Sequence, residues 1–489
     1  MKKIVNLAVI AFMGFSANAF AQDKGLEIQY MDTSIRPQDD FYNFVNGSWM
    51  KTAQIPADKS TWGSFNKLAE DTDNNSMTIL NSLLKDKFAT GSEGKKIQDL
   101  YATYMNMSKR NADGITPIKG DLSKIDAIKT IADLQKYLIA ATPQGENPFY
   151  GWGVEADMKN SKMNAVYLGS ANLGLGRDYY QKVNEKNTET LAEYTKYVSS
   201  MLKVLGYKNA DEVAAKIVSF EKEMAQSYFT NEQIRDSNLF YNPKTKEELK
   251  GISKNVDLAG YLSKVGVNTD KVILGEVNYY KNLDKFINQK NLPLIKDYMK
   301  FHLLSGSASY LTKDLDDQKF GFYGKYLRGQ QEQRAQNKRA YELINGTLGE
   351  AFGKLYVEKY FPAQAKAQMV ELIGYLKKSF EQHINNLSWM SATTKEKALT
   401  KLNKFAVKVA YPDKWKDYSK LTIASEKEGG TLYKNLQNIT AWQYKRDLDK
   451  IGKAVDKSEW GMTPQTVNAY YNPLNNEIVF PAAILQPPF

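Results

Sequence analysis

The sequence predicts a mainly α-helical protein whose C-terminal end begins a second, α+β domain. Three observations support this prediction: a length of 489 residues, helical spacing of apolar residues over most of the chain, and turn and strand signals in the last fifty residues. A chain of this length, 42% of it hydrophobic, exceeds the usual size of one core. We therefore expect two domains or one large helical body.

The region from about residue 76 to residue 405 has mainly helical periodicity. One apolar stripe at helical spacing consists of Val213, Ile217, Phe220, Met224 and Tyr228, and a second of Ile373, Leu376, Phe380 and Leu387. Breaks are expected at residues 143–148, at residues 169–176 and at Pro362. Such stripes are more typical of core packing than of ligand sites, so we expect both to be buried.

The last fifty residues change from helical to strand-like spacing. Residues 466–471 and 477–480 have the composition of two strands, and turn signals at Asn472-Pro473 and Asn475-Asn476 separate them. We expect a second domain to begin here and to be left incomplete. Residues 477–480 would then lack neighbouring strands and would leave an unpaired edge.

The first 21 residues have the layout of a secretory signal peptide. Lys2 and Lys3 precede the apolar run Ile4–Phe15, which is too short to span a bilayer. Ala19-Phe20-Ala21 supplies the small-x-small pattern of a cleavage site. We therefore expect a mature chain that starts at Gln22, is periplasmic or secreted, and has no membrane span.

Composition and histidine content exclude several functions. The net charge is +11, but the basic residues are scattered among 55 acidic ones and form no run of five, so no nucleic-acid partner is expected. The absence of cysteine excludes thiol nucleophiles and thiolate metal sites. The two histidines, His302 and His383, are far apart and have no acidic partner at i+4. Paired carboxylates stay open as catalytic groups, because the 55 acidic residues offer too many pairs to choose among.

Five segments of the chain carry recognisable motifs. They are Asp40–Phe65, Leu173–Tyr180, Gly349–Pro362, Leu387–Trp415 and Trp460–Phe489. The first contains D-F-Y-N-F-V-N-G-S-W, and the last contains N-A-Y at Asn468–Tyr470. In this order the segments resemble the neprilysin (neutral endopeptidase) family of zinc metallopeptidases, from about residue 40 to the final residue.

This resemblance implies a large helical domain and a thermolysin-like α+β catalytic domain, of which the chain would hold only the incomplete start. In the family, a helix carrying H-E-x-x-H binds zinc because two histidines four residues apart share one helix face. The glutamate between them polarises the metal-bound water. No such motif occurs up to Phe489. The resemblance therefore predicts no catalytic residue and no metal ligand in this chain. We expect zinc in the complete enzyme and none bound by this chain alone. We also expect no zinc-dependent hydrolysis, and a chain that tends to aggregate or needs a partner.

The resemblance also implies substrate contacts. Family members cut small peptides on the N-terminal side of hydrophobic residues. Asn468 and Ala469 match the residues that hold the peptide main chain in an extended form, by strand addition to an exposed edge. Phe65, Ile484 and Phe489 match positions that line the hydrophobic pocket after the scissile bond.

The resemblance divides the chain into four parts and includes one departure. We expect a signal peptide at 1–21, an extended arm at 22–39, a helical region at 40–420 of which 40–75 packs on the catalytic domain, and the connection and first catalytic strands at 421–489. Animal members place arginines near this Trp-Gly-Ser-Phe segment to grip a substrate carboxylate. Thr61 and Ala69 stand at the matching positions, so endopeptidase action fits better than release of dipeptides.

Three functions are therefore compared. The first is an exported zinc endopeptidase of which this is an incomplete copy. The second is a non-catalytic exported peptide-binding protein that keeps the helical chamber and the substrate-binding edge. The third is a periplasmic solute-binding helical protein, suggested only by size, signal peptide and 31 tyrosines, and the motif series argues against it. The expected partners are a peptide substrate and, as an open alternative, a separate C-terminal catalytic chain.

Overall fold

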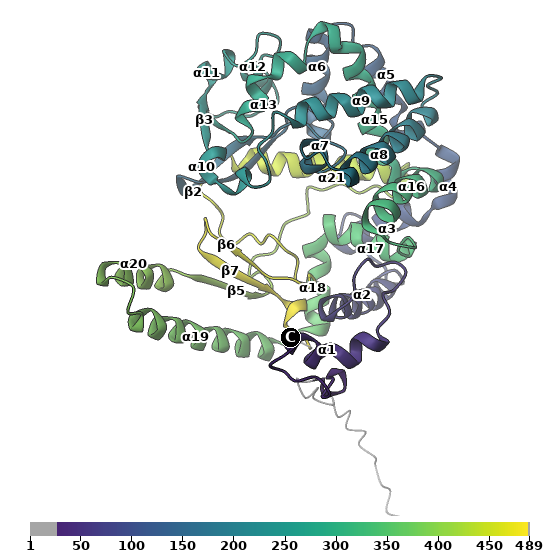
Figure 1. Ribbon diagram of the computed structural model, residues 1–489. Coiled ribbons are helices and arrows are strands. Elements are labelled where there is room, and N and C mark those ends of the chain that lie inside the picture. Colours follow the sequence, from purple (N-terminus) through teal and green to yellow (C-terminus); the bar gives the residue numbers. More distant parts are fainter. Residues whose placement is uncertain (1–26, 488–489) are drawn as a thin grey trace, which may run out of the picture. The chain divides into compact units, whose positions relative to one another are not determined.

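The computed structural model describes residues 27–487, and helices dominate it (Figure 1). The predicted mainly α fold class is therefore confirmed. The chain divides into two compact units, Met1–Gln54 with Gln486–Phe489, and Ile55–Leu485. The predicted signal peptide and Phe489 lie outside the described residues, and the predicted domain boundaries stay predictions. Among residues 27–487, no helix is both long enough and apolar enough to cross a membrane.

In the smaller unit, a short 3-10 helix and turns precede one α-helix. These elements are η1 (Ile28–Tyr30) and α1 (Phe41–Thr52). The helix begins after Asp40, whose carboxylate accepts a hydrogen bond from the N–H of Asn43. Lys51 donates to Asp32 at 2.6 Å, and this bond, with one from Ser34, lowers the pKa of Asp32 to about 2.

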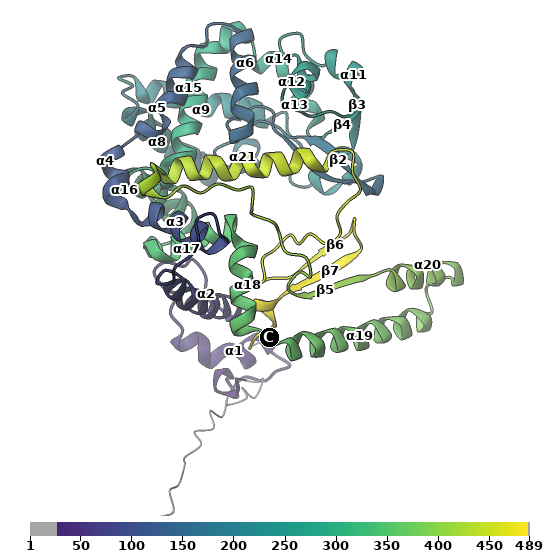
Figure 2. The same ribbon diagram turned by 180° about the vertical axis from the view of Figure 1, so that it is seen from behind.

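The larger unit contains a helical lobe (Figure 2). Its buried apolar side chains form one continuous core. We define this lobe as residues 107–327 together with α21 (Leu432–Lys450). Its other helices of eight or more residues are α5 (Thr116–Asp126), α6 (Ile131–Ala141), α8 (Glu185–Val204), α9 (Ala210–Ala225), α15 (Leu292–Ser307) and α16 (Lys313–Phe320). Its shorter helices are α4 (Met107–Asp113), α7 (Arg177–Gln181), α10 (Ser237–Phe240), α11 (Lys246–Lys250), α12 (Leu258–Lys264), α13 (Val277–Lys281) and α14 (Leu283–Phe286).

Single-turn helices link several elements of the lobe. They are the 3-10 turns η2 (Thr142–Gln144), η3 (Gln233–Arg235), η4 (Gln289–Asn291) and η5 (Ala308–Tyr310), and the π-helical turn η6 (Gly321–Tyr326). The first predicted stripe is confirmed, because its members on α9 are buried and Tyr228, just after the helix, is buried too. The predicted breaks at residues 143–148 and 169–176 also fall outside α-helices and strands.

A four-stranded sheet interrupts the helices of the lobe and was not predicted. Its strands are β1 (Trp152–Asp157), β2 (Asn160–Leu168), β3 (Asn242–Thr245) and β4 (Lys271–Leu274), in the order β1-β2-β4-β3. β1 and β2 form an antiparallel hairpin, whereas β2 pairs with β4 in parallel. That parallel pairing joins segments about a hundred residues apart, so local periodicity does not reveal it.

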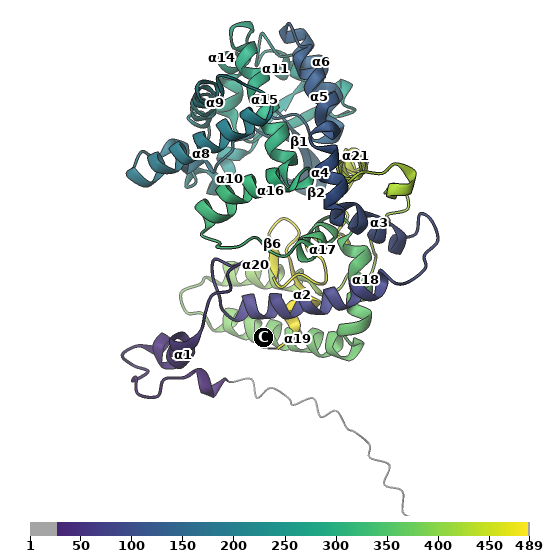
Figure 3. The same cartoon turned by 90° about the vertical axis from the view of Figure 1, so that its right-hand side faces the viewer.

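A second apolar core lies in what we call the base of the larger unit. The base comprises α2 (Ser64–Leu83), α3 (Glu93–Met105), α17 (Gln336–Thr347), α18 (Gly349–Tyr360), β5 (Ala406–Ala410), the 3-10 turn η7 (Glu426–Glu428), β6 (Tyr470–Asn472), β7 (Glu477–Pro481) and η8 (Ala482–Leu485). Figure 3 shows α2 and the helical lobe as separate layers.

The sheet of the base corrects two expectations. The first predicted strand, at residues 466–471, starts only at Tyr470. The second, β7, was expected to lack neighbours, yet it is the central strand of the order β5-β7-β6. It runs parallel to β5 and antiparallel to β6. The expectation was wrong because β5, which lies well upstream in the sequence, supplies the second neighbour.

An arm formed by α19 (Ala363–Asn386) and α20 (Ala392–Asn403) extends from the base (Figure 1). It begins at the predicted break, with Pro362 as the N-cap of α19. The prediction that its apolar stripe is buried was wrong: Ile373 is buried, but Leu376 is 50% and Phe380 61% exposed. The reason is that a 24-residue helix packs on the sheet through its contact with β5 and then continues beyond it.

Candidate functional site

The first candidate site is the outer edge of β6. This strand pairs with β7 alone, so its other edge carries no strand within the part of the chain that the structure describes. Asn468 and Ala469 directly precede it, and Asn468 is exposed. The side-chain Oδ1 of Asn468 accepts a hydrogen bond from the N–H of Ala469 at 2.8 Å. Strand addition by a peptide needs an exposed strand edge, and the exposed carboxamide of Asn468 lies beside this one.

The loop before this edge is held firmly against the base. Gln465 is buried and donates from Nε2 to Oδ1 of Asn345 at 2.8 Å and to the carbonyl of Gly349 at 2.9 Å. A Cβ at Gly353 would lie 2.8 Å from Cδ of Pro464, so the close approach of α18 to the loop requires glycine there. The position of Asn468 is thus set before any peptide arrives.

The residues predicted to line a hydrophobic pocket lie on adjacent elements. Phe65 is at the start of α2 and is 55% exposed, and Ile484 is half-buried in η8. The two elements contact each other. Phe489, the third predicted member, lies outside the described residues. The structure therefore brings together the elements that carry two of the three residues.

The residues present do not fit a zinc site. His302 lies on α15 and His383 on α19. Among residues 27–487, no group of three histidine, cysteine or acidic side chains could hold a metal ion, and the whole sequence contains no cysteine. The nearest approach to a ligand pair is Nε2 of His302 with Oε1 of Glu221, at 2.8 Å, and it lacks the further ligands that zinc requires.

This pair belongs to a buried polar cluster. Glu221, on α9, is fully buried and accepts hydrogen bonds from the hydroxyls of Tyr180 at 2.6 Å and Tyr194 at 3.2 Å. Burial, and then the charge of Glu221, raises the pKa of both tyrosines well above its usual value. The cluster joins α7, α8, α9 and α15 through one carboxylate. A sequence signal existed, because Glu221 falls on the apolar face of α9, one turn after Ile217.

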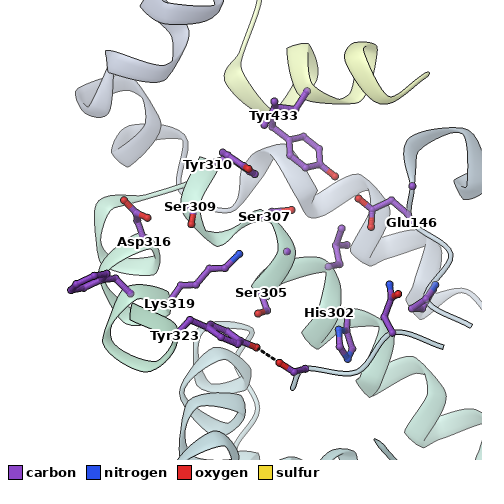
Figure 4. Close-up of a pocket in the computed structure, with 18 of the residues that line it drawn as sticks. Glu146, His302, Ser305, Ser307, Ser309, Tyr310, Asp316, Lys319, Tyr323 and Tyr433 are labelled. Atoms are coloured by element: carbon purple, nitrogen blue, oxygen red, sulfur yellow. Dashed lines mark hydrogen bonds between the residues drawn. The ribbon is translucent and has the colours of Figure 1, made fainter. Parts of the chain in front are cut away.

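Beside this cluster, a cavity of about 710 Å³ opens in the helical lobe (Figure 4). Its walls come from η2, α15, η5, α16, η6 and α21. Charged and hydroxyl side chains in these walls include Glu146, Ser307, Lys319, Tyr323 and Tyr433. This volume is typical of cavities that bind small molecules or short peptide segments. Sequence reasoning missed it because six separate elements contribute to it.

The carboxyl group of Glu146 titrates near neutral pH. Burial, followed by the charge of Asp121, raises its pKa to about 7. Tyr137, Tyr433 and Asp121 are its titratable neighbours on α6, α21 and α5. The charge that Glu146 brings to the cavity therefore depends on pH near this pKa.

Comparison with known proteins assigns the chain to a class of peptidases. A sequence model of peptidase family M13 matches residues 37–412. The chain therefore belongs to this family of zinc metallopeptidases, and the predicted relationship to the neprilysin-like enzymes is confirmed.

Individual relatives agree with the family model. The chain is 30% identical over 458 residues to a neutral endopeptidase of Lactococcus lactis subsp. lactis, a match that covers 93% of this chain and 72% of the relative. It is 28% identical to endothelin-converting enzyme 1 of Rattus norvegicus, covering 94% of this chain and 62% of that protein. The crystal structure of Mycobacterium tuberculosis zinc metalloprotease ZMP1 with an inhibitor superposes with a TM-score of 0.89 at 33% identity, covering 95% of this chain and 70% of that one.

Proposed function

We propose that this chain provides the helical lobe and the peptide-holding edge of an exported zinc endopeptidase. In this proposal, a peptide lies along the outer edge of β6 in an extended form. The side chain of Asn468 and the backbone of Ala469 hold its main chain. Phe65 and Ile484 contact the hydrophobic side chain that follows the scissile bond, as the family resemblance implies, and Phe489 is assigned to the same pocket from sequence alone. Cleavage would then fall on the N-terminal side of a hydrophobic residue.

One observation carries the proposal: an exposed asparagine stands directly before a strand edge that no described strand covers. Strand addition takes its affinity from main-chain hydrogen bonds, so it tolerates many peptide sequences, while side-chain pockets provide selectivity. The anchored loop at Gln465 supports this role, because a rigid edge loses little conformational freedom when a peptide binds.

Zinc would have to be bound by residues that this sequence does not contain. In the complete enzyme the metal would activate water for attack on the peptide bond. His302 is engaged with Glu221 inside the helical lobe, and His383 is exposed on the arm. We therefore assign no catalytic step to any residue of this chain and propose that, on its own, it binds peptides without cutting them. Export to the periplasm or the medium remains a prediction from residues 1–21.

The test is a comparison of peptide affinity between Asn468→Ala and the unchanged chain. Loss of the carboxamide should weaken binding of an extended peptide with a central hydrophobic residue by about tenfold, as expected for one or two lost hydrogen bonds. Fluorescence anisotropy with a labelled hexapeptide measures this. Asn438→Ala, which changes a carboxamide on α21, is the matched control and should leave affinity unchanged. Equal affinity for the unchanged chain and Asn468→Ala would contradict the proposed edge.

The second candidate function is a dedicated peptide-binding protein without catalysis. The absence of a metal-ligand set from the described residues, together with the lack of cysteine, favours it. Peptide hydrolysis after the addition of zinc and a catalytic segment distinguishes the two functions. If zinc and a catalytic segment from an M13 relative, added together, give chelator-sensitive hydrolysis that Asn468→Ala impairs, the chain is part of an endopeptidase. Peptide binding that never leads to cleavage supports the binding protein.

A further inference from the structure

The cavity in the helical lobe contains a half-buried lysine, Lys319, whose ammonium group forms no ion pair with the described residues. Lys319, on α16, points its ammonium group into the cavity (Figure 4). No hydrogen bond or ion pair to its Nζ occurs within residues 27–487. Burial lowers the pKa of this lysine, which records the cost of keeping its charge away from water. The charge of Asp316 opposes this lowering, yet the half-buried ammonium group forms no ion pair with that carboxylate and is free to meet an anion in the cavity.

The obvious counter-ion is already engaged. Asp316 lies one turn before Lys319 and is almost fully buried. Its Oδ2 accepts from Nη1 of Arg339 at 2.5 Å, and its Oδ1 accepts from Nε2 of Gln333 at 3.1 Å. Both oxygens therefore have donors, and Asp316 raises the pKa of Lys319 through its charge without forming an ion pair with it.

Other groups around Lys319 are suited to an anion. Ser307 lines the cavity, and Arg328 stands at its exposed rim as a second cation. Tyr323 comes from the π-helical turn η6 and donates from its hydroxyl to the carbonyl of Gly174 at 3.0 Å. Turns of this kind are rare and occur frequently at functional sites. Glu146 lies on the opposite side of the cavity (Figure 4).

We propose that this cavity is an accessory site for a carboxylate group of a peptide, bound by Lys319 with Arg328 at the entrance. The carboxylate completes the missing ion pair, and the hydroxyls of the walls donate to its second oxygen. That the carrier of the carboxylate is a peptide rests on the proposed function. The site itself is separate from the β6 edge, and none of its residues is shared with that edge.

The experiment measures how fast Lys319 reacts with a small amine-acetylating reagent, by mass spectrometry of the full chain. The probes are an acetylated pentapeptide with a free C-terminal carboxylate, its C-terminal amide, and an amide that ends in glutamate. The carboxylate-bearing peptides should slow labelling of Lys319 at least threefold, and the plain amide should not. Lys313, exposed on the same helix and paired with Asp317, is the internal control and should label at one rate throughout.

Affinity measurements with variants complete the test. Lys319→Met should lower the affinity for the free-acid peptide about tenfold, to that for the amide. Lys319→Arg should keep most of the higher affinity for the free acid. Lys313→Met should change neither affinity. Asn468→Ala should leave protection of Lys319 intact. Equal protection by acid and amide, or none by either, would overturn the accessory site. If the proposed peptide site at the β6 edge is wrong, Asn468→Ala should bind peptides as tightly as the unchanged chain. Different results therefore test the two proposals.

Discussion

The helical lobe buries a charged side chain, whereas the arm exposes large apolar side chains. In the lobe, the carboxylate of Glu221 is fully buried and is bonded by two tyrosines and a histidine. On the arm, Phe380 is 61% and Trp389 75% exposed, although both are strongly apolar. The lobe therefore adds a buried polar cluster to its apolar core, whereas the exposed apolar side chains of the arm contribute little to stability.

The largest expected effect is at Glu221. Glu221→Leu should lower the free energy of unfolding by about 3–5 kcal/mol, because Tyr180, Tyr194 and His302 would lose their shared acceptor in a dry interior. Urea unfolding followed by circular dichroism measures it. Glu221→Gln, which keeps an acceptor oxygen, is the matched control and should cost less than half as much. If Glu221→Leu lowers the free energy of unfolding by less than about 1 kcal/mol, the buried polar cluster does not stabilise the lobe as we expect.

A smaller, pH-dependent effect is expected at Glu146. Its folded-state pKa of about 7 lies above the ordinary value of 4.5, so folding favours the protonated carboxyl. This contribution is fully present below pH 4.5 and is lost as the pH rises through 7. Glu146→Gln mimics the protonated form, so it should raise the free energy of unfolding by about 2–3 kcal/mol at pH 8 and by nothing at pH 4.5. Denaturation at the two pH values tests this, and equal effects at both would contradict it.

The smallest effect on stability is expected on the arm. Phe380→Ser and Leu376→Ser should each change the free energy of unfolding by less than about 0.5 kcal/mol, because both side chains already face solvent. The same changes should reduce self-association, measured by light scattering, since they shrink an exposed apolar patch. Ile373→Ser, at the one buried position of this stripe, is the contrasting variant. A large loss of stability from Phe380→Ser would show that the arm packs as the lobe does.

Local patterns predicted part of this structure and missed the rest for physical reasons. The α9 stripe and strand β7 follow from periodicity, because each involves only neighbouring residues. The pairing of β7 with β5 and of β2 with β4 depends on segments distant in sequence. Periodicity also marked Phe380 as a core residue, since a helical stripe records an apolar face and says nothing of what covers it.

The candidate sites were predictable to different degrees. Asn468 and Ala469 were found through a specific motif, and the structure places them at an uncovered strand edge. Lys319 carried no signal, because one lysine among 66 basic residues is ordinary until its neighbours in space are known. Its significance depends on Asp316 being engaged by Arg339, a residue from another helix.

We propose that this member of peptidase family M13 binds peptides and holds no catalytic metal by itself. The most direct test measures zinc content and peptide hydrolysis on the same purified sample, with and without a chelator. We expect much less than one zinc per chain after dialysis and no chelator-sensitive cleavage. One tightly bound zinc per chain, with turnover that the chelator abolishes, would contradict the account.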